Sequence, residues 1–193
     1  SRYRLVESVG EADVVVLNTC SFIQPAVEES IATTFELTED WKPYGGDRKL
    51  IVAGCMPSRY GEELTSSMPE VDAFIPVADE GALLATLERL TGHAPGPAGE
   101  SVLRTTGSPS AYLKVSDGCF RSCAYCTIPS IRGAYRSTPL EEIAQEARVL
   151  AQGGAKEIVL IGQDISAYGR DLDEDVTLSD VLAAVAAVNE VEW

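Results

Sequence analysis

The chain has 193 residues and a mass of 20.6 kDa, which is enough for one or two domains with a hydrophobic core. Hydrophobic residues make up 45% of it and charged residues 23%, as in globular proteins, and no apolar run approaches the ~20 residues of a membrane-spanning helix. The formal net charge is −15 and the pI is near 4.4. Because this charge repels phosphate backbones and anionic membranes, composition argues against nucleic-acid or membrane binding.

The start of the chain and its cysteines bear on the cellular compartment. Nothing near Ser1 resembles a secretory leader with a charged region, an apolar core and a cleavage site. The five cysteines are an odd number and lack the density of a secreted disulfide scaffold; they are Cys20, Cys55, Cys119, Cys123 and Cys126. We therefore expect a trimmed cytoplasmic chain whose cysteines serve metal or redox chemistry.

The first half of the chain alternates strands and helices. Val14–Leu17 is a β-branched run typical of a strand buried on both faces of a parallel sheet, and it leads into Cys20. Leu50–Ala53 repeats this pattern and leads into Gly54 and Cys55. Between the two strands we predict a helix that begins at Pro25 and buries Val27, Ile31 and Phe35, followed by a polar loop at Asp40–Asp47.

A third unit has Val71–Ile75 as its strand. The helix after it is predicted to bury one leucine stripe: Leu83, Leu84, Leu87 and Leu90. This alternation predicts an α/β domain of the doubly wound type, in which sites form beyond the carboxyl ends of the strands. Cys20 and Cys55 follow two such ends.

Composition changes to Gly, Pro, Ser and Thr between Thr91 and Ser110, with little periodicity, which is typical of a linker. We therefore predict an amino-terminal domain at residues 1–91, a linker at 92–110 and a second domain at 111–193.

The second domain starts a new alternation of strands and helices. Strands are predicted at Tyr112–Val115 and Ile158–Ile161, and Val191–Trp193 reads as the start of a third. The helix between the first two has a predicted capping box, a proline at its first position and a left-handed glycine cap: Thr138 with Glu141, Pro139 and Gly153. Apolar stripes mark this helix and a later one: Leu140, Ile143, Ala147 and Leu150, then Leu178, Val181, Leu182, Val185 and Val188. A closed (β/α) barrel takes about 250 residues, so we expect only its first part.

The most informative motif is C-x-x-x-C-x-x-C at Cys119–Cys126, inside a loop predicted to span Asp117–Arg136. A closed structural zinc site takes four ligands, whereas a cluster held by three thiolates leaves one metal corner open for another ligand. The basic residues near the motif outnumber Asp117 and favour an anionic ligand such as a carboxylate: Lys114, Arg121, Arg132 and Arg136.

Other interpretations of these residues stay open. The thiols could be free, or could form a zinc loop completed by Cys20, Cys55 or His93. His93, in a Gly/Pro-rich segment, is better explained as a solvated residue. The basic side chains could equally form a solvated rim.

Several segments together resemble the radical S-adenosylmethionine methylthiotransferases. In the second half these are Asp117 to Cys126, Ile128-Pro129-Ser130-Ile131-Arg132-Gly133, and Gly162-Gln163-Asp164-Ile165-Ser166-Ala167-Tyr168-Gly169. In the first half, Asn18-Thr19-Cys20-Ser21-Phe22-Ile23 and Gly54-Cys55-Met56 resemble two of the three cysteine motifs of that family's amino-terminal domain. The resemblance implies a flavodoxin-like domain followed by the start of a radical-SAM partial (β/α) barrel. Because the third motif and the family's later segments are missing from this sequence, we expect a chain truncated at both ends and inactive by itself.

The resemblance also implies cofactors. In the complete protein there would be two [4Fe-4S] clusters, a radical cluster on Cys119, Cys123 and Cys126 and an auxiliary one on Cys20 and Cys55. The open iron of the radical cluster would be chelated by S-adenosylmethionine, and an electron donor of the flavodoxin or ferredoxin type would reduce it.

Further residues resemble contacts of S-adenosylmethionine. Tyr125 matches an aromatic position near the adenine, with a core tyrosine as the alternative. Gly162, Gln163 and Asp164 match a strand end that contacts the methionine amino group, with a simple turn as the alternative.

One branch of this family modifies an adenosine of transfer RNA, and another the β-carbon of an aspartate on the twelfth small-subunit ribosomal protein. Gln163-Asp164 resembles the second branch, since the first typically has Gln-Asn there. The net charge of −15 agrees, because an RNA substrate favours a basic groove. We therefore expect methylthio transfer to that aspartate, whose carboxylate Arg132 or Arg136 would hold. The alternatives are the transfer-RNA reaction and a non-catalytic iron–sulfur or zinc-binding module.

Overall fold

The structure is a computed structural model that describes residues 3–94, 109–173 and 175–193. The chain forms two compact units, Ser1–Ala98 together with Ser130–Arg132, and Gly99–Pro129 together with Gly133–Trp193. Most of the predicted linker at 92–110 lies outside the described residues. The domain limits therefore stay a prediction.

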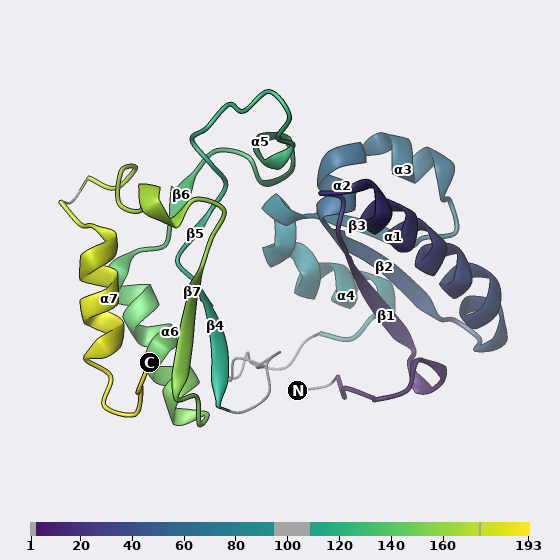
Figure 1. Cartoon of the computed structure of the whole chain (residues 1–193). Coiled ribbons are helices and arrows are strands. Elements are labelled where there is room, and N and C mark those ends of the chain that lie inside the picture. Colours follow the sequence, from purple (N-terminus) through teal and green to yellow (C-terminus); the bar gives the residue numbers. More distant parts are fainter. Residues whose placement is uncertain (1–2, 95–108, 174) are drawn as a thin grey trace. The chain divides into compact units, whose positions relative to one another are not determined.

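The first unit is built on a three-stranded parallel sheet in the order β1-β2-β3 (Figure 1). Its strands are β1 (Val14–Thr19), β2 (Lys49–Gly54) and β3 (Ala73–Pro76). In the central strand β2, Leu50, Ile51 and Val52 are fully buried, as expected when both faces of a parallel sheet are covered. Strand β1 is at the edge of this sheet, and Val16 is 40% exposed, so the prediction of burial on both faces is wrong there. The predicted α/β class is confirmed.

The helices predicted between the first two strands and after the third both form, with different limits, and further helical segments accompany them. They are η1 (Val9–Glu11), α1 (Gln24–Glu36), the π-helical turn η2 (Leu37–Trp41), η3 (Lys42–Tyr44), α2 (Cys55–Tyr60), α3 (Glu62–Ser67), η4 (Val77–Ala82) and α4 (Leu83–Thr91). The polar loop predicted at Asp40–Asp47 is wrong at its start, because the helical turns continue and bury Trp41 in the core.

Two predicted apolar stripes are only partly buried. In α1, Val27 is buried but Phe35 is 44% exposed, and Thr34 takes the buried position next to it. In α4 no residue is fully buried, and Leu84 is 47% exposed. The spacing of leucines therefore predicted the helix but overestimated its burial. No helix in the described ranges has the length and apolar character needed to cross a membrane.

The second unit contains two parallel strands, β4 (Ser110–Lys114) and β7 (Glu157–Ile161), joined through helix α6 (Leu140–Gln152). This strand–helix–strand unit is the repeat of a (β/α) barrel. The other elements are β5 (Ser116–Asp117), α5 (Ile128–Arg132), β6 (Arg136–Ser137), η5 (Ile165–Ala167) and α7 (Leu178–Ala186). In Figure 1, α6 and α7 cover one face of the β4/β7 pair.

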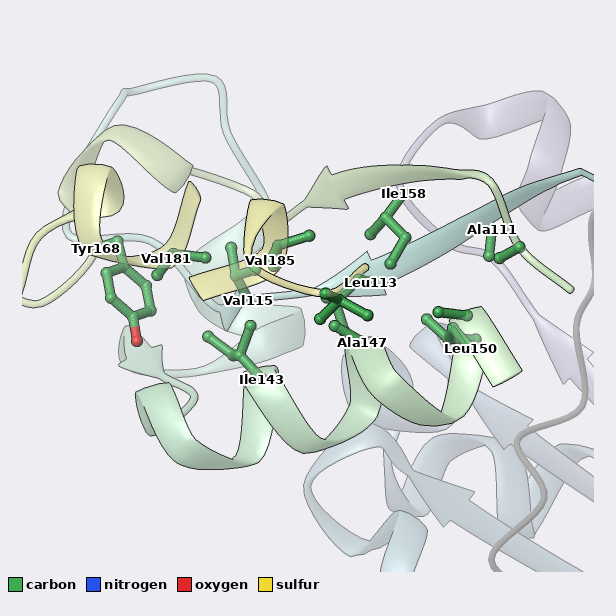
Figure 2. Close-up of a cluster of buried hydrophobic side chains, with 13 residues drawn as sticks. Ala111, Leu113, Val115, Ile143, Ala147, Leu150, Ile158, Tyr168, Val181 and Val185 are labelled. Carbon is green, nitrogen blue, oxygen red and sulfur yellow. The ribbon is translucent and has the colours of Figure 1, made fainter. Parts of the chain in front are cut away.

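The core of this unit lies between that face and the two helices (Figure 2). Leu113 of β4 and Val115, just after this strand, point into the core and meet Ile143 of α6 and Val181 of α7. Tyr112, which alternates with them, is 53% exposed, as expected for a strand with one covered face. Of the predicted α7 stripe, Leu182 is the exception, with 54% exposure.

The ends of the helices differ from the prediction. Pro139, not Thr138, is the N-cap residue of α6, and no side chain caps this end. Thr138 instead donates its backbone N–H to the carbonyl of Val115 at 2.9 Å, so a tertiary hydrogen bond replaces the predicted capping box. Gly153 has φ −71°, and the left-handed residue is Gly154 with φ +93°.

The capping box that does form was not predicted. It lies at the start of α7, where Thr177 and Asp180 bond reciprocally. Val191–Trp193 forms no strand, although the Ile158 N–H donates to the Trp193 carbonyl at 2.9 Å.

Candidate functional site

The three clustered cysteines lie in one loop, between β5 and α5. The β5/β6 pair closes its base, with Ser116 opposite Ser137 and Asp117 opposite Arg136. Gly118 has φ +72°, and a Cβ at this position would lie 2.5 Å from the carbonyl oxygen of Ala134. A side chain at Gly118 would therefore push the two ends of the loop apart.

The loop contains suitable donors for a metal cluster but does not gather them. Cys119 and Cys126 are half-buried, Cys123 is exposed, and all three are free thiols. The Arg121 N–H donates to Cys119 Sγ at 3.4 Å, and the Cys126 N–H donates to the Cys123 carbonyl at 3.0 Å. Within the described residues, no three Cys, His, Asp or Glu side chains are close enough together to hold a metal ion. To hold one metal cluster, the three thiols would have to move closer together than they lie in this structure.

The carboxyl end of β7 meets this loop through an ion pair. Arg121 Nε donates to Asp164 Oδ2 at 3.0 Å, and Ser166 Oγ donates to Asp164 Oδ1 at 2.6 Å. Both hydrogen bonds, first that from Ser166 and then that from Arg121, lower the pKa of Asp164. The Asp164 carboxylate in turn raises the pKa of Arg121. The structure thus joins Asp164 to the cysteine motif, although the two are far apart in sequence.

The other residues predicted at this strand end have different surroundings. A Cβ on Gly162 would lie 2.5 Å from Ser116 Oγ, so the backbone needs glycine for this close approach. Gln163 is exposed. Tyr125 is 89% exposed, which excludes the alternative that it is a core tyrosine. Lys114 forms an ion pair with Asp117 at 3.1 Å, so part of the predicted positive rim is already neutralised.

Asp171 supports the base of the loop. Its Oδ2 accepts the Ser137 N–H and its Oδ1 accepts the Ser137 hydroxyl, both at 2.7 Å. The Gly169 N–H donates to the same hydroxyl oxygen at 3.0 Å. The segment after η5 is thereby tied to β6.

We expect Asp171→Asn to destabilise the second unit by about 1 kcal/mol, because one charge-assisted hydrogen bond is lost. Burial raises the pKa of Asp171, but the hydrogen bonds from Ser137 outweigh it and the net direction is down. The Asp171 carboxylate therefore stabilises the second unit fully above its unfolded-state pKa of about 3.9. This stabilisation is lost as pH falls through the lower folded-state pKa. Urea unfolding at neutral and at acidic pH measures the difference.

The matched control for this prediction is Asp173→Asn, at an exposed carboxylate nearby. It should leave the unfolding midpoint unchanged at both pH values. An equal loss in both variants would show that general charge, not the Ser137 contact, is responsible.

Cys20 and Cys55 follow two neighbouring strands of the first unit. Strands β1 and β2 pair in parallel up to Thr19 opposite Gly54, so the next residue of each chain segment is a cysteine. Serine hydroxyls hold both backbones: Ser30 Oγ donates to the Cys20 carbonyl at 3.1 Å and Ser21 Oγ to the Cys55 carbonyl at 2.9 Å. Cys20 is exposed and Cys55 half-buried, both as free thiols.

His93 is an exposed residue, as the sequence predicts. Its Nδ1 lies 2.7 Å from the carbonyl oxygen of Thr91. It belongs to no metal-binding group within the described part of the chain.

Four contacts at the site were missed from the sequence. They are the Arg121–Asp164 pair, the bonds from Ser137 to Asp171, the donation from Arg132 to Cys55 Sγ at 3.5 Å, and the stacking of Phe120 on Tyr135 with ring centroids 4.6 Å apart. Each joins residues distant in sequence, and the residues themselves carry no local signal. The one hint in the sequence was Arg121, a basic residue inside the cysteine motif of an otherwise acidic chain.

Comparison with known proteins assigns each half of the chain. Residues 113–187 match the radical SAM superfamily, and residues 1–76 match the uncharacterized protein family UPF0004. The UPF0004 match contains Cys20 and Cys55, and the radical SAM match contains the C-x-x-x-C-x-x-C loop. These matches, and those to the relatives below, agree with the resemblance to the radical S-adenosylmethionine methylthiotransferases.

Over its whole length the chain is similar to proteins named ribosomal protein uS12 methylthiotransferase RimO. It is 44% identical to that of Geobacter sulfurreducens over 203 residues (100% of this chain, 45% of the relative). It is 42% identical to that of Syntrophus aciditrophicus over 204 residues (98% and 45%), and 41% identical to that of Myxococcus xanthus over 199 residues (99% and 41%). The chain spans about half the length of the curated relatives it matches.

Proposed function

We propose that the protein adds a methylthio group to the β-carbon of an aspartate on the twelfth small-subunit ribosomal protein. The observation that carries the proposal is the loop with Cys119, Cys123 and Cys126, held at the carboxyl end of β7 by Asp164. The names of the relatives, which cite ribosomal protein uS12, support the choice of substrate. Acting on a ribosomal protein would place the protein in the cytoplasm.

Membership of the radical SAM superfamily implies S-adenosylmethionine and an iron–sulfur cluster. The donor set fits such a cluster, because three free thiols stand within eight residues and leave one ligand position open. We assign the radical cluster to Cys119, Cys123 and Cys126. When bound together with S-adenosylmethionine, it supplies the one-electron chemistry that breaks an unactivated C–H bond, which no side-chain base could deprotonate.

The proposal also includes a second cluster. Cys20 and Cys55 follow neighbouring parallel strands, and Ser30 and Ser21 fix their backbones. This arrangement supports a shared [4Fe-4S] group as the source of sulfur chemistry. Reduction of the clusters would need an electron donor of the flavodoxin or ferredoxin type.

The remaining residues of the site bind and orient. Tyr125, with its exposed ring, would stack against an adenine. Gly162, Gln163 and Asp164 would line the methionine end of the cofactor. Arg136 is exposed at the base of the cysteine loop and could hold the carboxylate of the target aspartate through charge-assisted hydrogen bonds; Arg132 is the other candidate.

Salt dependence tests the proposed substrate class. A chain with net charge −15 should bind a basic ribosomal protein through opposite charge, so its affinity should fall as salt rises. Transfer RNA has the same sign of charge and should bind weakly at any salt. Binding is measured with each candidate across a salt series.

Mass spectrometry of the products from the protein then decides between the substrates. A methylthio group on the ribosomal protein is the expected result. The same group on transfer RNA, with none on the ribosomal protein, would overturn both the charge argument and the interpretation of Gln163-Asp164. The absence of iron and sulfide after anaerobic reconstitution would instead favour a zinc-binding or other non-catalytic module.

A further inference from the structure

We propose that Arg121 and Asp164 form a clamp that positions the cysteine loop against the carboxyl end of β7. In this role Arg121 is a positioning residue for the thiols on either side of it, and the charge of Asp164 acts on the loop through Arg121. The part of the inference that concerns cluster binding rests on the proposed function. The clamp itself is a property of the metal-free chain.

Arg121 lies inside the cysteine motif, so a contact of its side chain restrains the loop directly. It stands two residues after Cys119 and two before Cys123, and its own N–H donates to Cys119 Sγ at 3.4 Å. Its side chain leaves the loop and reaches Asp164 at 3.0 Å. A single residue therefore links the Cys119 thiol to the end of β7, and Cys123 follows it two residues later.

Asp164 is held in place before it meets the arginine. Its side chain is only 11% exposed, whereas that of Arg121 is 67% exposed. Ser166 Oγ occupies one carboxylate oxygen at 2.6 Å, which leaves the other oxygen for Arg121. The buried, hydrogen-bonded partner is thus at the end of β7, and the exposed partner is on the loop. This asymmetry is what a clamp on the loop requires.

The other restraint acts from the opposite end of the loop. Phe120 stacks on Tyr135, which is 6% exposed and precedes β6. Phe120 and Arg121 are neighbours, so the segment after Cys119 is held toward β6 by one side chain and toward β7 by the next. An exposed ion pair adds little to global stability, so its effect should be local to this loop. Contacts of this kind around metal ligands commonly change metal affinity by 10–100-fold.

The first experiment uses the reduced, metal-free chain. Chymotrypsin can cut after Phe120 and Tyr125, which are 53% and 89% exposed, and mass spectrometry of the new termini gives the rate at this loop. We expect Arg121→Gln and Asp164→Asn each to speed cleavage severalfold, and the double variant to be no faster than either alone. Lys156→Gln, which breaks the exposed pair with Glu192, is the matched control and should leave the rate unchanged.

The second experiment follows iron in the reconstituted chain. The rate of iron loss to a chelator should rise about tenfold in each single variant and no further in the double variant. Arg121→Lys should recover part of the loss, because it keeps the charge but not the guanidinium geometry. Thermal unfolding of the metal-free variants should stay near wild type, which separates positioning from folding.

The outcomes distinguish the two proposals. Cleavage rates that are unchanged, or additive in the double variant, would overturn the clamp whether or not iron binds. If the wild-type chain takes up no iron while the cleavage results hold, the clamp stands and the proposed cluster fails. If Asp164→Asn changes neither cleavage nor iron loss but abolishes the effect of S-adenosylmethionine on the cluster's electron paramagnetic resonance, Asp164 serves the cofactor alone and the clamp is overturned.

Discussion

Replacing Cys119, Cys123 or Cys126 by alanine is expected to abolish reductive cleavage of S-adenosylmethionine, whereas Cys20→Ala is expected to spare it. The first three thiols share one loop of the second unit, and removing any one leaves a cluster short of a ligand. Cys20 stands in the first unit, at the end of β1. The measurement is release of 5'-deoxyadenosine by the complete protein under dithionite.

Two comparisons make this result decisive. Ser122→Ala changes an exposed residue inside the same loop and should keep full release, which controls for disturbance of the loop. Iron content should fall in each of the three loop variants and fall separately in Cys20→Ala. Full release of 5'-deoxyadenosine by a variant that lacks Cys119, Cys123 and Cys126 would contradict the assignment of the radical cluster to these residues.

Local pattern was sufficient for the architecture. The β-branched run at Val14–Leu17 and the alternation in Tyr112–Val115 both became parallel strands, because burial in a sheet selects those residue types. The predictions that failed concern features that depend on residues close in space but distant in sequence. Val16 is exposed because β1 is at an edge of its sheet, and Thr138 left its predicted cap for a hydrogen bond to Val115.

The sequence predicted the candidate metal ligands of the site, but not the side-chain contacts that hold the cysteine loop in place. Cysteine spacing is a local signal, and the strand pattern correctly predicted that Cys20 and Cys55 each follow the end of a strand. The ion pair of Arg121 with Asp164 could not be predicted from the sequence, because 43 positions separate the two residues. The same is true of Ser137 and Asp171. The sequence specifies such pairs only through the packing of the whole unit, which lies outside the reach of any short window.

Gly54→Ala is expected to destabilise the first unit strongly, because the backbone of Gly54 leaves no space for a side chain directly before Cys55. Gly54 is the last residue of β2, with φ +97°, and precedes Cys55. A Cβ there would lie 2.4 Å from Asn18 Oδ1 and 2.7 Å from the Thr19 carbonyl oxygen. The Asn18 side chain can move, but the Thr19 backbone belongs to β1 and cannot move without disturbing the strand pairing.

The loss in free energy of unfolding should be about 2–6 kcal/mol, since backbone strain costs about 1–3 kcal/mol and a collision in a packed region about a further 1–3 kcal/mol. Gly61→Ala is the matched control: φ is +50° but nothing lies within 4 Å of its Cβ, so only the strain should remain. Urea unfolding is followed by Trp41, buried in this unit, in a Trp193→Phe background that removes the other tryptophan. Because the same collision would force Cys55 away from Cys20, iron bound by a chain lacking the three loop thiols should fall in Gly54→Ala and persist in Gly61→Ala. Equal losses of stability and iron in both variants would show that backbone strain alone, and not the close approach of β2 to β1, places the two cysteines.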